Sequence, residues 1–312
     1  MSEKPFSQTK VFTFLRFVAL GIAAWLILLK WNDAPENWPE WRLWQWISLG
    51  ILSIAGLLLE AYLWWLPAQT LQPFTFGKAI SNTLTFQYFH LFAPSGISEF
   101  SARFVQFKDK NLRKKSVELT ALIQSSKWIA RLLLAAIGLS FLQLQEWKPW
   151  MAVGSSALLI GAVAIIILLV KKPHYWIRWL NPKWESRVDR WLPQVRQGSF
   201  PIQWLSAVSL AKTLTYTLAF AFLIHPDEIF QIDLLWDNLT ASWAFYFAAS
   251  FLPSLGIAEG LIKAGAGVLF FTPWEISEYR VAGAAFLIWI FNKALPGLLG
   301  GLLSLFNFSS KS

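Results

Sequence analysis

Long uninterrupted apolar runs constrain this chain more than any other feature. Residues 11–30 read VFTFLRFVALGIAAWLILLK, and residues 151–170 read MAVGSSALLIGAVAIIILLV. A helix of about 20 apolar residues spans the hydrocarbon core of a bilayer. Only 14% of the 312 residues are charged, against about 25% in an ordinary soluble domain. We therefore expect an integral membrane protein, and we expect residues 11–30 to be a retained span because no small-residue cleavage site follows them.

The length of these runs also selects the fold class. A backbone exposed to lipid must satisfy its own hydrogen bonds, so it forms either helices or a closed barrel. Barrel strands alternate in hydrophobicity over segments of about 10 residues, and this chain does not show that pattern. We predict an all-α polytopic integral membrane protein that forms a single membrane domain over residues 1–312. Its six predicted full spans are 11–30, 44–66, 117–142, 150–170, 201–224 and 281–306.

Two further apolar stretches, 79–107 and 236–271, are interrupted by Pro and Gly. Each is too long for one helix and too short for two full crossings. Lys and Arg concentrate in cytoplasmic loops, which places the basic segments 103–115 and 171–199 and both termini in the cytoplasm. The acidic or neutral connections, 31–43, 225–237 and 272–280, are then external. Each interrupted stretch therefore begins and ends on one side, as a re-entrant helical hairpin or as a pair of short crossings.

The two interrupted stretches share a motif. Both read F-x-P-S-(x)-G-I-x-E, the first around Pro94, Gly96 and Glu99 and the second around Pro253, Gly256 and Glu259. Gly and Glu keep a separation of 160 positions. The spans that precede the two motifs run in opposite directions, so repeat 1 (about 44–142) and repeat 2 (about 201–306) are predicted to be inverted. Inverted repeats with interrupted helices are typical of secondary transporters, whose binding sites lie at the interruptions.

Ionisable side chains inside these apolar segments indicate where a site would lie. Such a group near the bilayer centre costs roughly 2.5–3.5 kcal/mol, so it is usually functional. We predict a central polar site with Glu99, Arg103 and Arg131 in one half and Glu259 and Lys293 in the other. The alternative is structural: Glu99 and Glu259 cap the returning half-helices and pair with Arg103 or Arg131 and with Lys263 or Lys293. Glu60 is expected to pair with Lys127 or Lys212, and His90 to be packed and hydrogen-bonded rather than to relay protons.

The motifs resemble a known family. The pattern P-x-G-I-x-E-x-x-x-R at Pro94–Arg103, P-x-x-G-I-x-E at Pro253–Glu259, the Arg-bearing segment 128–131, and Asn292-Lys293 followed by Pro296-Gly297 are similar to the transmembrane flippase-like region of lysylphosphatidylglycerol synthases. The resemblance implies a bacterial inner-membrane protein related to lipid flippases. In those synthases a separate soluble domain attaches the amino acid. Because this chain ends directly after its last predicted span, we do not expect that activity here.

Several function classes have no support in the sequence. There is no Cys, the three His share no metal-ligand spacing, and no G-x-x-x-x-G-K-[ST] motif occurs. We therefore expect no enzyme activity, cofactor, metal or nucleic-acid partner. The expected function is movement of an anionic or aminoacylated phospholipid across the inner membrane without ATP hydrolysis by this chain. The alternatives are a secondary transporter of a small solute or ion and a non-catalytic partner of a cell-envelope lipid synthase, and a homo-oligomer is possible in each case.

Overall fold

The regular structure is helical throughout the part of the chain that the computed structural model describes. That part comprises 40–93, 95–142, 202–224, 232–252, 256, 258–271 and 276–309, with isolated positions between 154 and 164. Its elements are α2 (Leu43–Ala68), α3 (Phe76–His90), α4 (Ser95–Val105), α5 (Lys110–Leu142), α10 (Ile202–Ile224), α11 (Ile232–Ala249), α12 (Ala258–Phe271), α13 (Glu278–Trp289), the π-helix η2 (Ile290–Ala294) and α14 (Leu295–Ser309).

Four helical segments are long and apolar enough to cross a membrane: Leu43–Ala68, Lys110–Phe141, Gln203–Ile224 and Glu278–Leu303. They coincide with four of the six predicted spans, which confirms the helical class and supports a membrane protein. The predicted span 11–30 and the basic segment 171–199 lie outside the described residues. The predicted span 150–170 does too, apart from its isolated helical positions.

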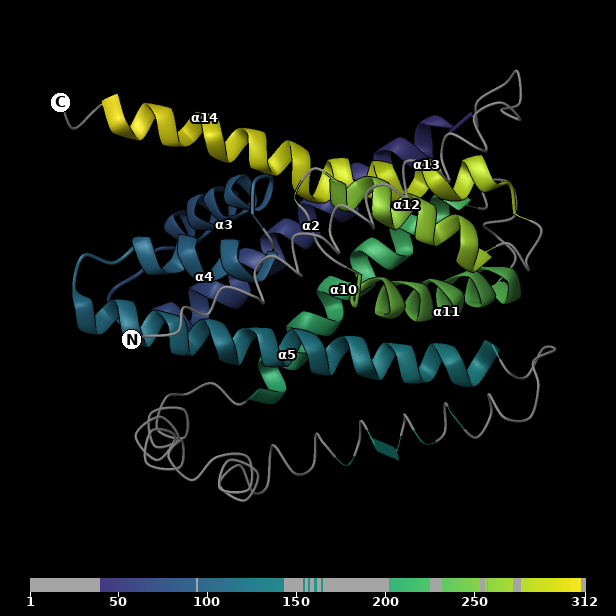
Figure 1. The fold of residues 1–312 in the computed structure, drawn as a ribbon, viewed down its shortest axis with the longest axis horizontal. Coiled ribbons are helices and arrows are strands. Elements are labelled where there is room, and N and C mark those ends of the chain that lie inside the picture. Colours follow the sequence, from purple (N-terminus) through teal and green to yellow (C-terminus); the bar gives the residue numbers. More distant parts are fainter. Residues whose placement is uncertain are drawn as a thin grey trace, which may run out of the picture.

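Helices α2 and α10 pack against each other through the centre of the structure (Figure 1). On one side of this pair, α3 and α4 lie between α14 and α5. On the other side, α12 packs against α13, and α11 packs against α5. Each interrupted stretch is thus a pair of helices, α3–α4 and α11–α12. The first helix of each pair packs against the last long helix of the other predicted repeat.

The two helix pairs touch where each chain segment is interrupted. The first interruption follows His90 and the second contains Gly256, which has a φ of +60°. A Cβ at Gly256 would lie 2.2 Å from the Leu91 carbonyl oxygen. Only glycine adopts this left-handed conformation without penalty and also admits so close a backbone. The interruptions are therefore in direct contact. Pro94 and Pro253, the predicted helix breakers, lie outside the described residues.

Two other glycines allow close helix packing at corresponding places. A Cβ at Gly138 of α5 would lie 2.4 Å from the Thr240 carbonyl oxygen of α11, and a Cβ at Gly300 of α14 would lie 2.1 Å from the Leu84 carbonyl oxygen of α3. Small residues of this kind let the backbones of membrane helices approach closely. The contacts α5–α11 and α14–α3 thus use the same device.

The basic segment 103–115 differs from its prediction as a loop. Arg103 lies within α4, and the basic residues from Lys110 onward belong to the first turns of α5. The helix begins this early because Asp109 caps it: its Oδ1 accepts hydrogen bonds from the backbone N–H of Asn111 at 2.7 Å and of Leu112 at 2.9 Å. The connection between α4 and α5 is consequently short, and it holds these two helices in a fixed relation.

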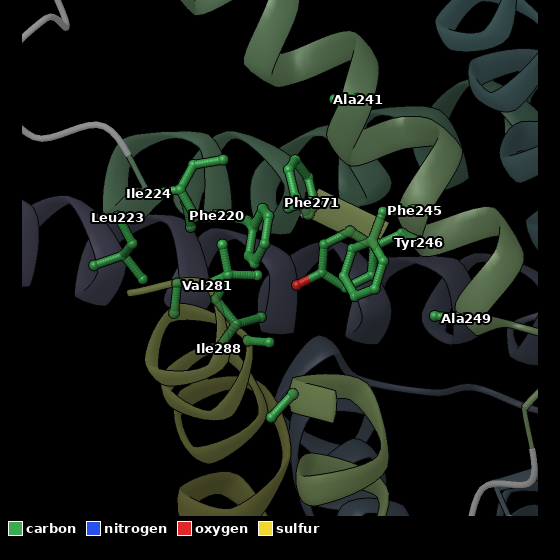
Figure 2. Packing of buried hydrophobic residues seen from close by; sticks show 14 of the residues in the cluster. Phe220, Leu223, Ile224, Ala241, Phe245, Tyr246, Ala249, Phe271, Val281 and Ile288 are labelled. Atoms are coloured by element: carbon green, nitrogen blue, oxygen red, sulfur yellow. The ribbon is translucent and has the colours of Figure 1, made fainter. Parts of the chain in front are cut away.

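The largest buried apolar cluster joins α10, α11, α12 and α13. Phe220, Phe245 and Phe271 meet in its centre, with ring centroids 5.5–5.8 Å apart (Figure 2). Val281 and Ile288 close it from α13. A smaller apolar core around Trp64 and Phe107 joins α2, α3, α5 and α10. These two cores hold together α2, α3, α5, α10 and α12, which carry most of the ionisable side chains described below.

Candidate functional site

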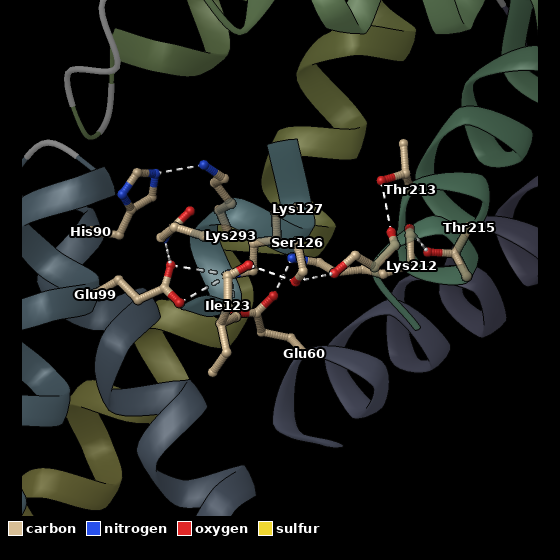
Figure 3. A network of polar contacts seen from close by, with 12 residues as sticks. Glu60, His90, Glu99, Ile123, Ser126, Lys127, Lys212, Thr213, Thr215 and Lys293 are labelled. Carbon is tan, nitrogen blue, oxygen red and sulfur yellow. Dashed lines mark hydrogen bonds and ion pairs between the residues drawn. The ribbon is translucent and has the colours of Figure 1, made fainter. Parts of the chain in front are cut away.

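One group of buried ionisable side chains is centred on Glu60 of α2, which is only 1% exposed. Its Oε1 lies 2.6 Å from Lys127 Nζ of α5 and 3.4 Å from Arg103 Nη2 of α4. Its Oε2 pairs with Lys212 of α10. The sequence left open whether Glu60 pairs with Lys127 or with Lys212, and the structure shows that it pairs with both (Figure 3).

Glu99 of α4 extends this group. Its Oε1 lies 2.6 Å from Arg103 Nη2 and 3.0 Å from Lys127 Nζ, and its Oε2 accepts a hydrogen bond from Gln124. Arg103 is also stacked over the Trp64 ring, with its Cζ 4.5 Å from the ring centroid. We call Glu60, Glu99, Arg103, Lys127 and Lys212 the first cluster. It draws one charged side chain or more from each of α2, α4, α5 and α10.

The second cluster consists of His90, Glu259, Lys263 and Lys293. Glu259 Oε1 lies 2.6 Å from Lys263 Nζ, one turn further along α12, and 2.8 Å from Lys293 Nζ of η2. Glu259 Oε2 lies 2.6 Å from His90 Nε2 of α3. Lys293 Nζ also lies 2.6 Å from His90 Nε2. The predicted Glu259–Lys293 pair is therefore present, with His90 as a third member.

Lys293 owes its position to a local change in helix type. Residues 290–294 form a π-helix between α13 and α14, and Leu295 N–H donates to the Ile290 carbonyl five residues back. Pro296 follows directly. Proline lacks an N–H and its ring clashes with the carbonyl four residues earlier, so a wider turn before it relieves both problems. π-Helical turns of this kind often occur at functional sites.

Both clusters border one cavity of about 480 Å³. Its charged lining comprises three carboxylates, Glu60, Glu99 and Glu259, and five cations, Lys127, Arg131, Lys212, Lys263 and Lys293. The cations exceed the carboxylates by two, and Arg103 adds a further positive charge behind Glu99. Trp128, Tyr216, Tyr246 and Trp289 supply aromatic walls. The cavity is thus a positively charged, partly aromatic chamber between helices.

The predicted site residues come together with three differences. Arg131 lines the cavity, but its guanidinium lies over Trp128 (5.6 Å to the ring centroid), and no ion pair of the described residues includes it. Arg103 does not line the cavity: it lies behind Glu99 and is 2% exposed. Glu99 is the fifth residue of α4 and lies beyond its first turn, so it does not cap that helix. Glu259 does lie in the first turn of α12.

The predicted helix-breaking residues also differ from one another. Gly256 lies in the interruption with positive φ, whereas Gly96 is the second residue of α4. Helix α4 begins at Ser95, and residues 91–93 before it form a turn. The helix α4 thus starts earlier than the motif predicted, and Gly96 has a helical backbone.

The sequence alone did not pair His90 with Glu259, and it left Lys127 and Lys212 as alternative partners of Glu60. Glu60 lies 152 positions from Lys212, and His90 lies 169 positions from Glu259. Each is an isolated ionisable residue in an apolar helix, which is the signal that could have identified them together. His90 was expected to be packed and hydrogen-bonded, and it is, but its partners are the two ionisable groups of the second cluster.

The chain was compared with protein-family models, curated proteins and solved structures, and none of them matches it.

Proposed function

We propose that the protein is a flippase-like transporter that moves an anionic phospholipid across the bacterial inner membrane without hydrolysing ATP itself. The observation that carries this proposal is the cavity with excess positive charge between helices long enough to cross a membrane. Charged groups within membrane segments usually mark the path of a substrate. The motifs that resemble the flippase-like region of lysylphosphatidylglycerol synthases agree with it.

The charge pairing favours an anionic over an aminoacylated headgroup. Each carboxylate that lines the cavity already contacts at least two cations: Glu60 and Glu99 share Lys127 and Arg103, and Glu259 contacts Lys263 and Lys293. A substrate amine would have to displace one of them. Arg131 has no carboxylate partner among the described residues, so its guanidinium can hold a phosphate with two parallel hydrogen bonds.

The cavity wall favours a lipid over a small solute. Trp128 and Leu252 line the cavity, and each is 37% exposed. Phe251, which is 69% exposed, contacts the Trp128 ring at a centroid distance of 5.7 Å. A headgroup in the cavity would therefore have apolar side chains beside it on which acyl chains can lie.

The helix packing supports the inverted repeat on which the transport mechanism depends. Exchanging the repeats exchanges α3 with α11 and α5 with α14, and the observed contacts α3–α14 and α11–α5 are related by that exchange. The central pair α2–α10 is its own counterpart. We propose that the two helix pairs are re-entrant and that relative motion of the repeats exposes the cavity to each leaflet in turn.

Leaflet exchange in proteoliposomes tests this function. Phosphatidylglycerol and phosphatidylcholine, each labelled on an acyl chain, are incorporated, and a membrane-impermeant reductant removes the label from the outer leaflet. We expect the protein to make the inner-leaflet phosphatidylglycerol accessible, and phosphatidylcholine much less so. Uptake of inorganic phosphate with no lipid movement would instead identify a small-anion transporter, and the absence of both would refute transport.

Arg131→Gln is the informative variant, and Lys114→Gln is its matched control. Both remove one positive charge from α5, but Lys114 is exposed and remote from the cavity lining. A hydrogen bond to a charged group contributes about 1.5–3 kcal/mol, which corresponds to roughly tenfold or more in rate or affinity. We expect Arg131→Gln to slow phosphatidylglycerol exchange by about that factor, and Lys114→Gln to leave it unchanged.

A further inference from the structure

His90 is the most deeply buried ionisable side chain of the second cluster, at 0% exposure. It is the last residue of α3, immediately before the first interruption, whereas Glu259 follows the second interruption and Lys293 lies in the π-helix. Glu259 and Lys293 line the cavity and His90 lies behind them. A single nitrogen, Nε2, is 2.6 Å from Glu259 Oε2 and 2.6 Å from Lys293 Nζ.

One imidazole nitrogen cannot serve both of these contacts fully. When Nε2 carries a hydrogen, it donates to the Glu259 carboxylate; when it carries none, its lone pair accepts from the Lys293 ammonium. The protonation of Nε2 therefore selects between two hydrogen-bonding patterns. Ser98 Oγ lies 3.4 Å from the other ring nitrogen, Nδ1.

The remaining charges around α3 do not offer His90 a third strong partner. Lys263 of α12 contacts Glu259 Oε1 at 2.6 Å. Glu99 and Arg103 of α4 pair with each other, and Glu60 of α2 pairs with Lys127 and Lys212. Helix α14, which packs along α3, contains no ionisable residue. Among the described residues, the protonation of His90 thus depends on Glu259 and on the lysines beside it.

An anion in the cavity acts on this group through Lys293. The Lys293 side chain is 23% exposed, and a phosphate beside it would compete with Glu259 and with His90 Nε2 for its ammonium. Glu259 would then lose part of its positive surroundings, and Nε2 would lose its donor. Both changes favour the imidazolium form, in which Nε2–H donates to Glu259 while Nδ1 also carries a hydrogen and faces Ser98 Oγ. The ring then gains one proton from water rather than moving a hydrogen between its two nitrogens.

We propose that His90, Glu259 and Lys293 form a proton-binding site that takes up one proton when an anionic phosphate group enters the cavity. The proposal rests on the proposed function and adds its coupling ion. The proton comes from the water on the side to which the cavity is open and ends between His90 and Glu259. One proton enters with one phosphate monoanion, so the loaded cavity gains no net charge. Proton and anion each increase the affinity for the other by the same factor.

The location of this site also connects protonation to the helix pairs α3–α4 and α11–α12, whose relative motion we propose above. A Cβ at Gly256 would lie 2.2 Å from the Leu91 carbonyl oxygen and 3.2 Å from the His90 carbonyl oxygen, so the two interruptions meet at the backbone of His90. His90 and Glu259 are thus the ionisable groups on either side of the contact between the two helix pairs. A change in their hydrogen bond acts directly on that contact.

Calorimetry on the detergent-solubilised full chain measures the proton directly. Binding of dioctanoyl phosphatidylglycerol is measured at one pH in several buffers that differ in ionisation enthalpy, and the slope of observed enthalpy against ionisation enthalpy gives the number of protons exchanged. We expect uptake of about one proton for the wild type. We also expect the dissociation constant to rise about tenfold per pH unit where the free site loses its proton.

The variant His90→Gln assigns the proton, with Glu118→Gln as a control that removes an ionisable group from α5 away from the cavity. We expect His90→Gln to bind phosphatidylglycerol with no proton uptake and no pH dependence, and the control to behave like the wild type. If the melting temperature shows that His90→Gln is unfolded, His90→Asn replaces it. Proton uptake retained in a folded His90 variant would overturn the assignment.

The outcomes separate this inference from the function on which it rests. If the wild type binds phosphatidylglycerol with no proton exchange, the coupling is wrong and the lipid site stands. If the wild type neither binds phosphatidylglycerol nor exchanges it between leaflets, the proposed function fails and the coupling fails with it.

Discussion

Glu60 shows how a single buried carboxylate links the helices as well as the site. It is 1% exposed and contacts Lys127, Lys212 and Arg103, which come from three other helices. A buried charge of either sign is costly unless it is paired and hydrogen-bonded. The first cluster is therefore a condition for folding as much as a place to bind, and its members cannot be replaced one at a time without a loss of stability.

We expect Glu60→Gln to destabilise the protein by about 3–5 kcal/mol, because Lys127 and Arg103 keep their burial but lose a counter-charge. The melting temperature of the detergent-solubilised protein measures this loss. Glu118→Gln, a partly exposed carboxylate on α5, serves as the control and should melt within about 1 °C of the wild type. Equal melting temperatures for Glu60→Gln and the wild type would show that the cluster makes no net contribution to stability.

At this scale the local half of each cluster could be predicted, and the distant half only in part. Glu99 with Arg103, and Glu259 with Lys263, are four positions apart and so lie on one helix face. Lys293 was predicted because it is an ionisable residue inside an apolar span. No local rule connects His90 to Glu259 or Glu60 to Lys212, because those pairs depend on which helices pack together. Arg131 lines the cavity, and its stacking on Trp128 follows from side-chain geometry that the sequence does not specify.

At the scale of helices, Gly138 and Gly300 set how closely α5 packs against α11 and α14 against α3. The helical segments themselves were predictable from their apolar runs, and four predicted spans agree with the structure to within a few residues, except that α5 begins at Lys110 rather than at 117. That difference arises because Asp109 caps a basic helical turn, which hydropathy alone scores as a loop. The π-helix at 290–294 was not predicted, since its only local signal is Pro296.

We expect Gly300→Ala and Gly50→Ala to change stability in opposite directions. A Cβ at Gly300 would lie 2.1 Å from the Leu84 carbonyl oxygen, so α14 and α3 must separate at a cost of about 1–3 kcal/mol. Gly50 is within α2 and a Cβ there meets nothing within 4 Å, so alanine should stabilise that helix by about 0.5–1 kcal/mol. Melting temperatures of the two variants test the sign, and stabilisation by Gly300→Ala would contradict the close α3–α14 packing.

At the scale of the whole molecule, the antiparallel pair α5–α11 shows which residues lie at opposite ends of a predicted membrane span. Phe141 near the end of α5 contacts Trp236 near the start of α11, with ring centroids 5.1 Å apart, and Trp128 contacts Phe251 just after α11. Lys114, at the beginning of α5, is about 27 residues of helix from Phe141, or roughly 40 Å at 1.5 Å per residue. Lys114 and Asp233 therefore lie at opposite ends of this pair, and both are exposed.

Because the chain has no Cys, single cysteines can be introduced without removing any residue to prepare the background. We expect Asp233→Cys in intact cells to react with a membrane-impermeant maleimide, and Lys114→Cys to react only after the cells are permeabilised. The reason is that α5 is long and apolar enough to cross a membrane, and its basic end is expected to remain in the cytoplasm. Lys110→Cys, also exposed and one helical turn before Lys114, is the matched control and should follow Lys114→Cys.

Labelling of Asp233 and Lys114 from the same side would show that α5 does not cross. Labelling of Lys114 and protection of Asp233 in intact cells would reverse the orientation while leaving the span intact.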